Sequence, residues 1–274
     1  MKKFIYALSV VFMLCAISCG DDGDEPNNPN GNNTTSKVET ITVNGILFNM
    51  VKVDGGTFQM GATEGQPVGD VNTPVHQVTV SSYSIGQTEV TAELWQAVMG
   101  SSPYSNNNEF VHAVADKLPV VHVSWNDCNT FIQKLNMLTK KKFRLPTEAE
   151  WEFAARGGNK THGYVYSGGN ELDLVAWHGD NSSNHLHPVA SKVPNELNIY
   201  DMSGNATEYC SDFYGEYSSE PQTNPQGPSS NQYMYRVLRG GDAERMGKSN
   251  YAVSARGYVN QGSPNDFQGF RLAL

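Results

Sequence analysis

The chain has 274 residues, with 28 acidic and 19 basic side chains, a net charge of −9 at neutral pH and 38% hydrophobic residues. A chain with this negative charge repels the phosphate groups of nucleic acid, so nucleic acid is excluded as the expected partner. The length is sufficient for one large domain, and the sequence contains neither an internal repeat nor a second linker-like segment after the first forty residues.

The N-terminus has the pattern of an export signal. Lys2 and Lys3 precede an apolar run, 4–17, that is too short to span a membrane as a helix. Small residues then precede Cys19, a pattern that resembles a bacterial lipobox, in which Cys19 is lipidated and becomes the mature N-terminus. We therefore interpret residues 1–18 as a lipoprotein signal peptide, with a plain secretory signal as the alternative.

Residues 19–37 are expected to form a disordered acidic and asparagine-rich tether, because 20–36 contain no aromatic or aliphatic side chain to bury. Four acidic residues follow the cysteine closely: Asp21, Asp22, Asp24 and Glu25. They resemble the signal that sends lipoproteins of some Gram-negative bacteria to the outer face of the outer membrane, although an ordinary solvated linker has the same composition. We expect an exported protein, lipid-anchored to the bacterial outer membrane, whose domain comprises 38–274.

Two cysteines remain after the signal and the anchor, Cys128 and Cys210. An exported compartment permits disulfides. The sequence alone cannot bring their Cα atoms within bonding range, so one disulfide and two buried free thiols both stay open.

The first half of the domain predicts short strands and helices. Residues 46–60 indicate two strands separated by a hairpin-like turn at 54–56, and 76–85 indicate a further strand. Thr91 is a suitable N-cap for a short helix that ends at Gly100. A polar loop, 101–108, is expected to be exposed.

A longer helix follows a brief predicted strand at 120–123. Ser124 and Asp127 mark its start, and apolar residues recur at helical spacing on one face: Cys128, Phe131, Ile132, Leu135 and Leu138. Cys128 is thus expected in the core, which argues against a catalytic role for its thiol.

The stretch 144–158, RLPTEAEWEFAARGG, contains a complete helix signature. Thr147 is a good N-cap, Glu150 completes a capping box, and Gly157 ends the helix. Beyond Gly158 the chain loses periodicity for long intervals, which is typical of ordered functional loops. The pattern predicts an α+β domain with low regular secondary structure.

Three stretches together carry a family resemblance. They are 144–158, the segment NELNIYDMSGNATEYCSD at 195–212, and a C-terminal series of Arg239-Gly240-Gly241, Arg256 and Gly269-Phe270-Arg271. They resemble the formylglycine-generating enzyme, or sulfatase-modifying factor, family over roughly 51–274, with Asn198 in place of a frequent glycine and Tyr209 in place of a frequent tryptophan. The resemblance implies a C-type-lectin-like fold.

The second stretch also suggests a calcium site. Calcium prefers six to eight oxygen ligands, and two carboxylates frame a glycine-containing turn here. At the matching positions the family holds calcium with the side chains of Asp201 and Glu208 and the carbonyls of Gly204 and Ala206. The alternative is an Asx-type turn whose carboxylates cap nearby N–H groups.

The resemblance fails at the family's catalytic centre. Family enzymes carry two cysteines spaced C-x-x-x-x-C after the arginine-glycine-glycine motif, which bind copper(I) and let oxygen oxidise a substrate cysteine. Copper(I) favours such soft thiolate ligands. The corresponding residues here are Arg245 and Asn250, and no cysteine follows Cys210. We therefore predict no catalytic residue at these positions and no copper.

Two further sets of residues have alternative interpretations. His178, His185 and His187 lie close enough in sequence to bind zinc or iron, although their spacing matches no standard helix or hairpin pair. Three arginines in a segment of low charge are expected to be buried and bidentate to carboxylates or carbonyls: Arg239, Arg256 and Arg271.

The function expected first is a non-catalytic binding or structural module of the cell envelope, with a protein or glycan ligand. Its support is the missing cysteine pair, the lipid tether and four tyrosines suited to stacking on sugars or anchoring interfaces, Tyr214, Tyr217, Tyr233 and Tyr235. Core packing is the other interpretation of those tyrosines. The alternative functions are a formylglycine-generating oxidase acting on a sulfatase cysteine and an oxidase that uses histidine-bound iron.

Overall fold

The computed structural model describes residues 37–102, 117–245 and 247–274. The predicted signal peptide, Cys19, nearly all of the tether and most of the 101–108 loop lie outside the described residues. Ser36–Leu274 forms one compact unit. Within the described ranges, every helix falls short of the length and hydrophobicity that crossing a bilayer requires.

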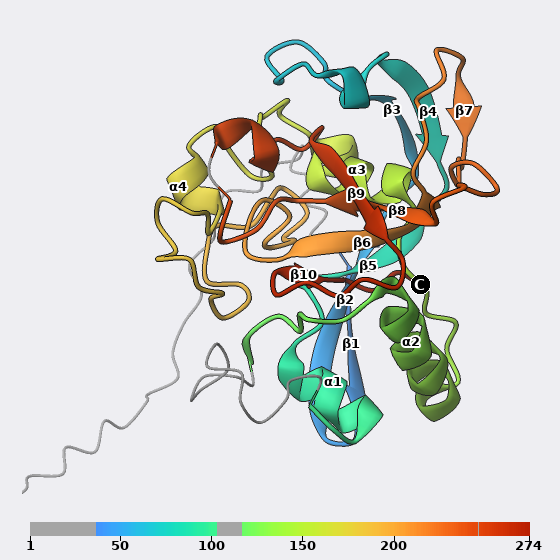
Figure 1. The fold of residues 1–274 in the computed structure, drawn as a ribbon, viewed down its shortest axis with the longest axis vertical. Coiled ribbons are helices and arrows are strands. Elements are labelled where there is room, and N and C mark those ends of the chain that lie inside the picture. The colour runs from blue at the N-terminus through green and yellow to red at the C-terminus, as the bar shows by residue number, and fades with distance from the viewer. Residues whose placement is uncertain (1–36, 103–116, 246) are drawn as a thin grey trace, which may run out of the picture. The chain divides into compact units, whose positions relative to one another are not determined.

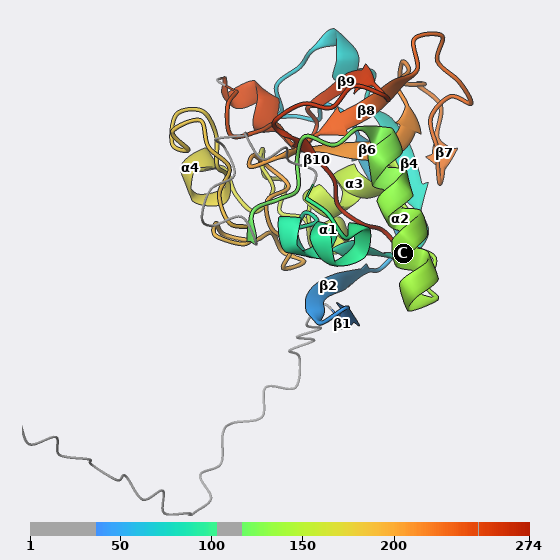
Figure 2. The same ribbon diagram turned by 60° about the horizontal axis from the view of Figure 1, so that its bottom comes forward.

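The first of three small sheets is antiparallel, in the order β1-β2-β5, with bounds β1 Val38–Val43, β2 Ile46–Val53 and β5 Tyr83–Gly86. Helices α1 (Ala92–Met99) and α2 (Trp125–Thr139) pack against this sheet (Figures 1 and 2). Their apolar faces form one core cluster that includes Trp95, Phe131 and Phe270.

The other two sheets form the rest of the domain. One has the order β10-β6-β8-β9, with bounds β6 Thr207–Phe213, β8 Tyr235–Arg239, β9 Arg256–Asn260 and β10 Gln268–Gly269. The other has the order β3-β4-β7, with bounds β3 Gly56–Met60, β4 His76–Val80 and β7 Gln222–Thr223. Short helices decorate the loops: η1 Asp70–Asn72, η4 Gly158–Lys160, α4 Leu172–Val175 and η5 Lys248–Tyr251.

Helix α3 (Glu148–Ala155) packs against both of these sheets (Figure 1). The Thr147 side chain accepts a hydrogen bond from the Glu150 N–H, and the Glu150 side chain reaches back to the Thr147 N–H, as the predicted capping box requires. Gly157 follows with a φ of +87° and ends the helix. The alanines of α3 allow close packing, so almost the whole of this helix is buried.

The strand predictions needed correction where pairing is not local. The 46–60 strands are not a hairpin, because β2 pairs with β1 and β5 whereas β3 pairs with β4. The 76–85 segment is likewise two strands in different sheets. Residues 120–123 form no strand, because His122 adopts a positive φ of 59° and its N–H bonds to the Asn265 carbonyl.

One predicted core position was also wrong. Leu138 follows the helical spacing of the α2 apolar face, yet its side chain is exposed near the end of the helix. The other four positions of that face are buried: Cys128, Phe131, Ile132 and Leu135. The helix ends at Lys140, which adopts the left-handed conformation with a φ of 59°.

Candidate functional site

Two glutamates of α3 pair with arginines from β8 and β9. Glu148 accepts two hydrogen bonds of 2.7 Å from Arg256, one on each carboxylate oxygen. Glu152 is fully buried and lies 2.5 Å from Arg239 Nη2 and 2.7 Å from Arg156 Nη2. Although burial acts to raise it, Arg156 and Arg239 hold the pKa of Glu152 below its usual value. These pairs fasten α3 to the sheet.

The last arginine of the chain makes a third buried pair. Arg271 donates to both oxygens of Glu208 at 2.6 Å and also to the carbonyls of Gly86 and Tyr200. Trp151 Nε1 donates a further hydrogen bond of 2.7 Å to Glu208. Both charged side chains are fully buried. The C-terminal residues beside β5 hold Arg271 here, because Gly86 N donates to the Leu272 carbonyl.

A cluster of buried carboxylates surrounds this pair. Glu89 and Asp201 are 2% and 4% exposed, and Asn205 donates to Glu89 Oε1 at 3.1 Å. Glu89 Oε2 has no hydrogen-bond partner among the described residues. Burial, together with the charges of Asp201 and Glu208, raises the pKa of the Glu89 carboxyl well above its usual value, and burial raises the pKa of Asp201. The cluster therefore contains three acidic groups beside one arginine, Arg271, and the surroundings favour the protonated form of Glu89.

The predicted calcium segment lies at this cluster. Asp201 and Asn198 both adopt positive φ, 58° and 63°, which asparagine and aspartate tolerate in the place of glycine. Gly204 also has a positive φ, and a Cβ there would lie 2.2 Å from the Trp177 carbonyl oxygen, so this position requires glycine. Asp201 Oδ2 accepts from the Ala190 N–H at 2.7 Å. Glu89 belongs to the same cluster, but sequence reasoning missed it because it lies outside the motif.

The positions of the family's copper cysteines share one small cavity. Arg245 and Asn250 line a space of about 40 Å³ with glycines of the 239–241 turn. Asp242 holds Arg245 through its N–H at 3.0 Å and its Nε at 3.1 Å. Neither side chain is a thiol.

The two cysteines of the domain are free thiols, so the alternative of a disulfide is not what the structure contains. Cys128 belongs to the core cluster around α1 and α2, whereas Cys210 belongs to the cluster around α3. Burial raises the pKa of both thiols well above the usual value, so neither is poised as a thiolate ligand or nucleophile.

The three histidines have separate surroundings. His178 is buried, with its Nε2 2.7 Å from Asp173, whereas the His187 ring stacks on Trp177 with ring centroids 3.6 Å apart. Within the described ranges, no group of three or more histidine, cysteine or acidic side chains is arranged to hold a metal ion.

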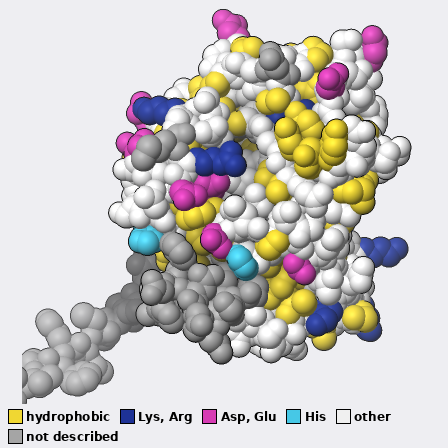
Figure 3. All heavy atoms as spheres, viewed as in Figure 1, with side chains coloured by type: hydrophobic (Ala, Val, Ile, Leu, Met, Phe, Trp, Pro, Cys, Tyr) yellow, Lys and Arg dark blue, Asp and Glu magenta, His cyan; other side chains and the backbone are white. Residues whose placement is uncertain are grey.

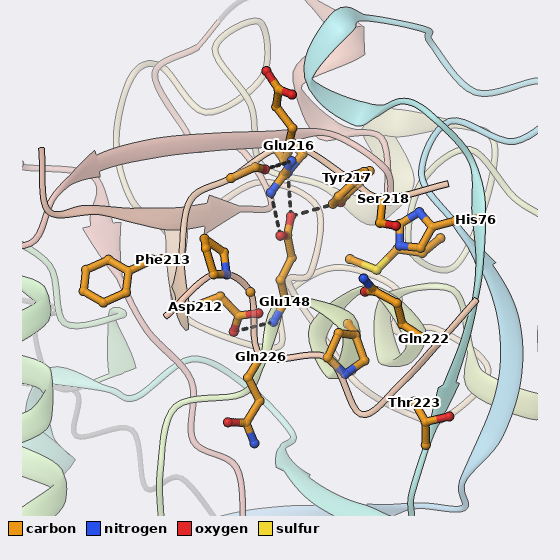
Figure 4. A pocket seen from close by; sticks show the side chains of 17 residues that line it. His76, Glu148, Asp212, Phe213, Glu216, Tyr217, Ser218, Gln222, Thr223 and Gln226 are labelled. Carbon is orange, nitrogen blue, oxygen red and sulfur yellow. Dashed lines mark hydrogen bonds and ion pairs between the residues drawn. The ribbon is translucent and has the colours of Figure 1, made fainter. Parts of the chain in front are cut away.

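A second cavity has a volume of about 590 Å³, within the usual range of ligand pockets. It lies between the start of α3, the 212–228 segment and the β3-β4-β7 sheet, and its walls include His76, Glu148, Asp212, Tyr217, Gln222 and Arg256. Figure 4 shows Glu148 near the centre, bonded to Tyr217 and to a guanidinium, with His76 and Gln222 on the facing wall. The sequence singled out Tyr217 and Arg256 but not this cavity.

Asp212 is the unusual group of this cavity. Its Oδ2 accepts from the Glu148 N–H at 3.1 Å and from the Ser211 hydroxyl at 2.8 Å. Burial, aided by the negative charge of Glu148, raises the pKa of Asp212 to about 7. Near pH 7 this carboxyl is therefore partly protonated and partly ionised.

The Asp212 pKa predicts a pH dependence of stability. An unfolded aspartate titrates near about 3.9. The stabilisation linked to Asp212 is fully present below that pH and is lost as pH rises through the folded value of about 7. The separation of the two pKa values corresponds to at most roughly 4 kcal/mol. We expect the free energy of unfolding of Asp212→Asn to fall less between pH 4 and 8 than that of the unchanged protein. Parallel urea-denaturation curves for the two proteins across this range would contradict the assignment.

Of the four tyrosines singled out in the sequence, Tyr217 lines this cavity and Tyr214 contacts Arg256 of its wall. Tyr217 and Tyr214 are half-buried and both lie against Arg256, 4.0 and 4.7 Å from the ring centroids to its Cζ. Tyr233 is exposed and packs on Tyr235, with ring centroids 5.4 Å apart. Figure 3 shows hydrophobic side chains gathered on this face, over β8 and β9.

Comparison with known proteins assigns this chain to a family. The sulfatase-modifying factor enzyme 1-like domain matches residues 36–274. The chain belongs to the sulfatase-modifying factor family. The formylglycine-generating enzyme of Streptomyces coelicolor is 31% identical over 81% of this chain and 88% of its own length. The α+β, C-type-lectin-like architecture with little regular secondary structure is therefore as the motifs predicted.

Other members of the family have different names. Chaperone protein LppX of Paenibacillus barcinonensis is 32% identical over 72% of this chain and 79% of its own length. Serine/threonine-protein kinase pkn1 of Chlamydia pneumoniae is 32% identical over 83% of this chain, which spans only 38% of that kinase. Among solved structures, Treponema denticola variable protein 1 has a TM-score of 0.77 and 32% identity, covering 86% of this chain and 98% of its own.

Proposed function

We propose that this chain is a non-catalytic member of the sulfatase-modifying factor family that binds a protein or glycan ligand. The observation that carries the proposal is the replacement of the two copper cysteines by Arg245 and Asn250 in the small cavity beside β8. The described cysteines elsewhere are buried thiols of raised pKa and offer no substitute site. A fold is retained more readily than the chemistry of a site, and the relative named as a chaperone also fits a binding role.

Copper(I) binding tests this proposal. The purified protein should lose copper(I) completely to a competing chelator, because carboxylates and guanidinium groups are poor ligands for a soft cation. Retention of one copper ion per chain would refute the argument from the missing cysteines. The alternative function, oxidation of a sulfatase cysteine to formylglycine, would then be favoured, in line with the Streptomyces relative.

We propose that the protein acts at the cell envelope, anchored through a lipid on Cys19. The support is the sequence of the first 25 residues, with its basic start, apolar run and acidic residues after Cys19. Membrane extraction of cells that produce Cys19→Ser beside the unchanged chain tests this placement. Equal recovery of the two chains in the membrane fraction would count against a lipid anchor.

We further propose that calcium binds at the carboxylate cluster. The support is the match of residues 195–212 to the calcium segment of the family, together with Glu89 Oε2, an oxygen without a hydrogen-bond partner among the described residues. The described side chains do not form a ready-made metal site, so calcium binding would have to rearrange the carboxylates. The Glu208 oxygens already accept from Arg271 and Trp151, so calcium would share them. The Asp201 carboxylate and the carbonyls of Gly204 and Ala206 would complete the set that the family uses.

Calcium binding predicts a calcium-dependent stability. The thermal midpoint should be higher in calcium than in chelator. At a calcium concentration one hundred times Kd, binding adds about 2.7 kcal/mol to the free energy of unfolding. Asp201→Asn should abolish most of that difference, since asparagine keeps the positive φ and the acceptor for the Ala190 N–H but loses the charge. A thermal midpoint in the unchanged protein that calcium does not move would eliminate the site.

A further inference from the structure

We propose that the Asp212 cavity and the tyrosine row beside it form a binding site for a neutral glycan. The tyrosine row is Tyr233, Tyr235, Tyr258 and Tyr214. The inference deepens the proposed binding function and rests on it. It selects glycan over protein and locates the contact, which neither the family nor the relatives assign.

Two charged groups of the cavity wall, Glu148 and Arg256, are paired with each other. Glu148 accepts from Arg256, Arg239 and Tyr217, with three of these hydrogen bonds on Oε1 and one on Oε2. Arg256, the single arginine or lysine in the described cavity wall, donates from Nη1 to the carbonyls of Val71 and Gly215. An anionic ligand therefore finds no free cation here, and it would have to pass Glu216 at the rim.

A cationic ligand is also disfavoured. The guanidinium of Arg256 already occupies the faces of Tyr214 and Tyr217, where a ligand cation would otherwise bind. A second positive charge there would meet Arg256 directly. Because both signs of charge are disfavoured, the cavity suits a polar ligand without net charge.

The uncharged groups of the wall match hydroxyls. Among the described residues, both hydrogen bonds to Asp212 fall on Oδ2, which leaves Oδ1 to accept from a ligand. His76 Nδ1 lies 3.2 Å from the Pro74 carbonyl, which fits the tautomer with the hydrogen on Nδ1 and with Nε2 as an acceptor. Gln222 and Gln226 each offer an amide with donors and an acceptor. Sugar hydroxyls both donate and accept, as this mixture requires.

The tyrosine row extends the site along the sheet. Tyr258 contacts Tyr214 and Tyr235 with ring centroids 4.3 and 4.8 Å apart, and it is 49% exposed. Arg256 and Tyr258 point to the same face of β9, because alternate residues of a strand do so. Arg256 thus connects the cavity to the row. Exposed aromatic faces next to hydroxyl-binding groups suit pyranose rings, whose C–H faces are apolar and whose rims are polar.

Affinity electrophoresis of the full-length protein tests the inference. The gels would contain neutral glucan, mannan, galactan or xylan polymers, with heparin as an anionic probe. Variants Tyr258→Ala and Gln226→Ala probe the row and the cavity, and Tyr258→Phe keeps the ring. Leu174→Ala, on α4, is the control at another exposed apolar residue, 60% exposed against 49% for Tyr258. Folding of each variant is checked by its thermal midpoint.

We expect retardation by at least one neutral polymer, a Kd at least tenfold weaker for Tyr258→Ala, and little change for Tyr258→Phe and Leu174→Ala. Retardation by none of the neutral polymers, by heparin alone, or to the same extent in Tyr258→Ala and the unchanged protein would overturn the glycan site. These failures leave the proposed non-catalytic function intact. Retention of copper(I) refutes that function separately.

Discussion

Replacing Arg271 by alanine should destabilise the domain by about 3–5 kcal/mol, because it leaves the Glu208 carboxylate buried without its partner. Both side chains are fully buried, and Arg271 also donates to the carbonyls of Gly86 and Tyr200. Among the described residues, Glu208 would retain only the side-chain hydrogen bond from Trp151. The same substitution therefore affects β6, α3 and the C-terminal residues together.

Urea denaturation measures this effect against a matched exposed pair. Lys52 lies 2.9 Å from Asp54, and both side chains are more than half exposed. Lys52→Ala should change the free energy of unfolding by no more than about 1 kcal/mol. If Arg271→Ala does not fold, Arg271→Lys can be measured in its place, because lysine keeps the charge but loses the bidentate geometry. Its loss of free energy of unfolding should lie between those expected for Lys52→Ala and Arg271→Ala. A loss for Arg271→Lys as small as that for Lys52→Ala would contradict the role assigned to this pair.

Introducing the two absent cysteines should change copper(I) affinity by several orders of magnitude. Arg245 and Asn250 line the same cavity, so thiols at both positions would face one another across a small space. Two thiolates supply the soft ligands that copper(I) selects. We expect Arg245→Cys with Asn250→Cys to retain copper(I) against a chelator that strips the unchanged protein.

The matched control is Arg245→Ser with Asn250→Ser. Serine is similar in size to cysteine but carries a hard oxygen donor in place of the thiol. Serine at both positions should not retain copper(I). If the serine and cysteine pairs bind alike, the copper ligands lie elsewhere, and the interpretation of these two positions fails. Copper retention without catalytic activity would still support the proposal, because thiolates alone do not supply a substrate groove.

Local signals in the sequence were sufficient for the helices. The Thr147 cap of α3, its capping box with Glu150 and the end at Gly157 all act within a few residues, so the sequence contains the whole determinant. Strand pairing is different, because a partner can lie anywhere in the chain. The break at residues 81–82 separates β4 from β5 and sends them to different sheets, and no local pattern marks that exchange.

The candidate functional site could also be predicted only in part from local sequence patterns. The motif at 195–212 led to Asp201 and Glu208, but Glu89 joins them from the segment after β5, far away in sequence. The Asp212 cavity combines α3, β7 and β9, none of which carries a recognisable binding pattern alone. Nearby charges were a usable signal, since three arginines in a segment of low charge needed buried carboxylate partners, and α3 and β6 supply them.

The most direct test of the non-catalytic assignment is a mass-spectrometric assay for formylglycine. The purified protein, copper, oxygen and a peptide with the sulfatase-type Cys-x-Pro-x-Arg motif are incubated beside an active family enzyme. We predict that the peptide cysteine remains a thiol with this protein while the control converts it to the aldehyde. Conversion of the cysteine by this protein would show that an active centre exists without cysteines at positions 245 and 250, and it would contradict the account.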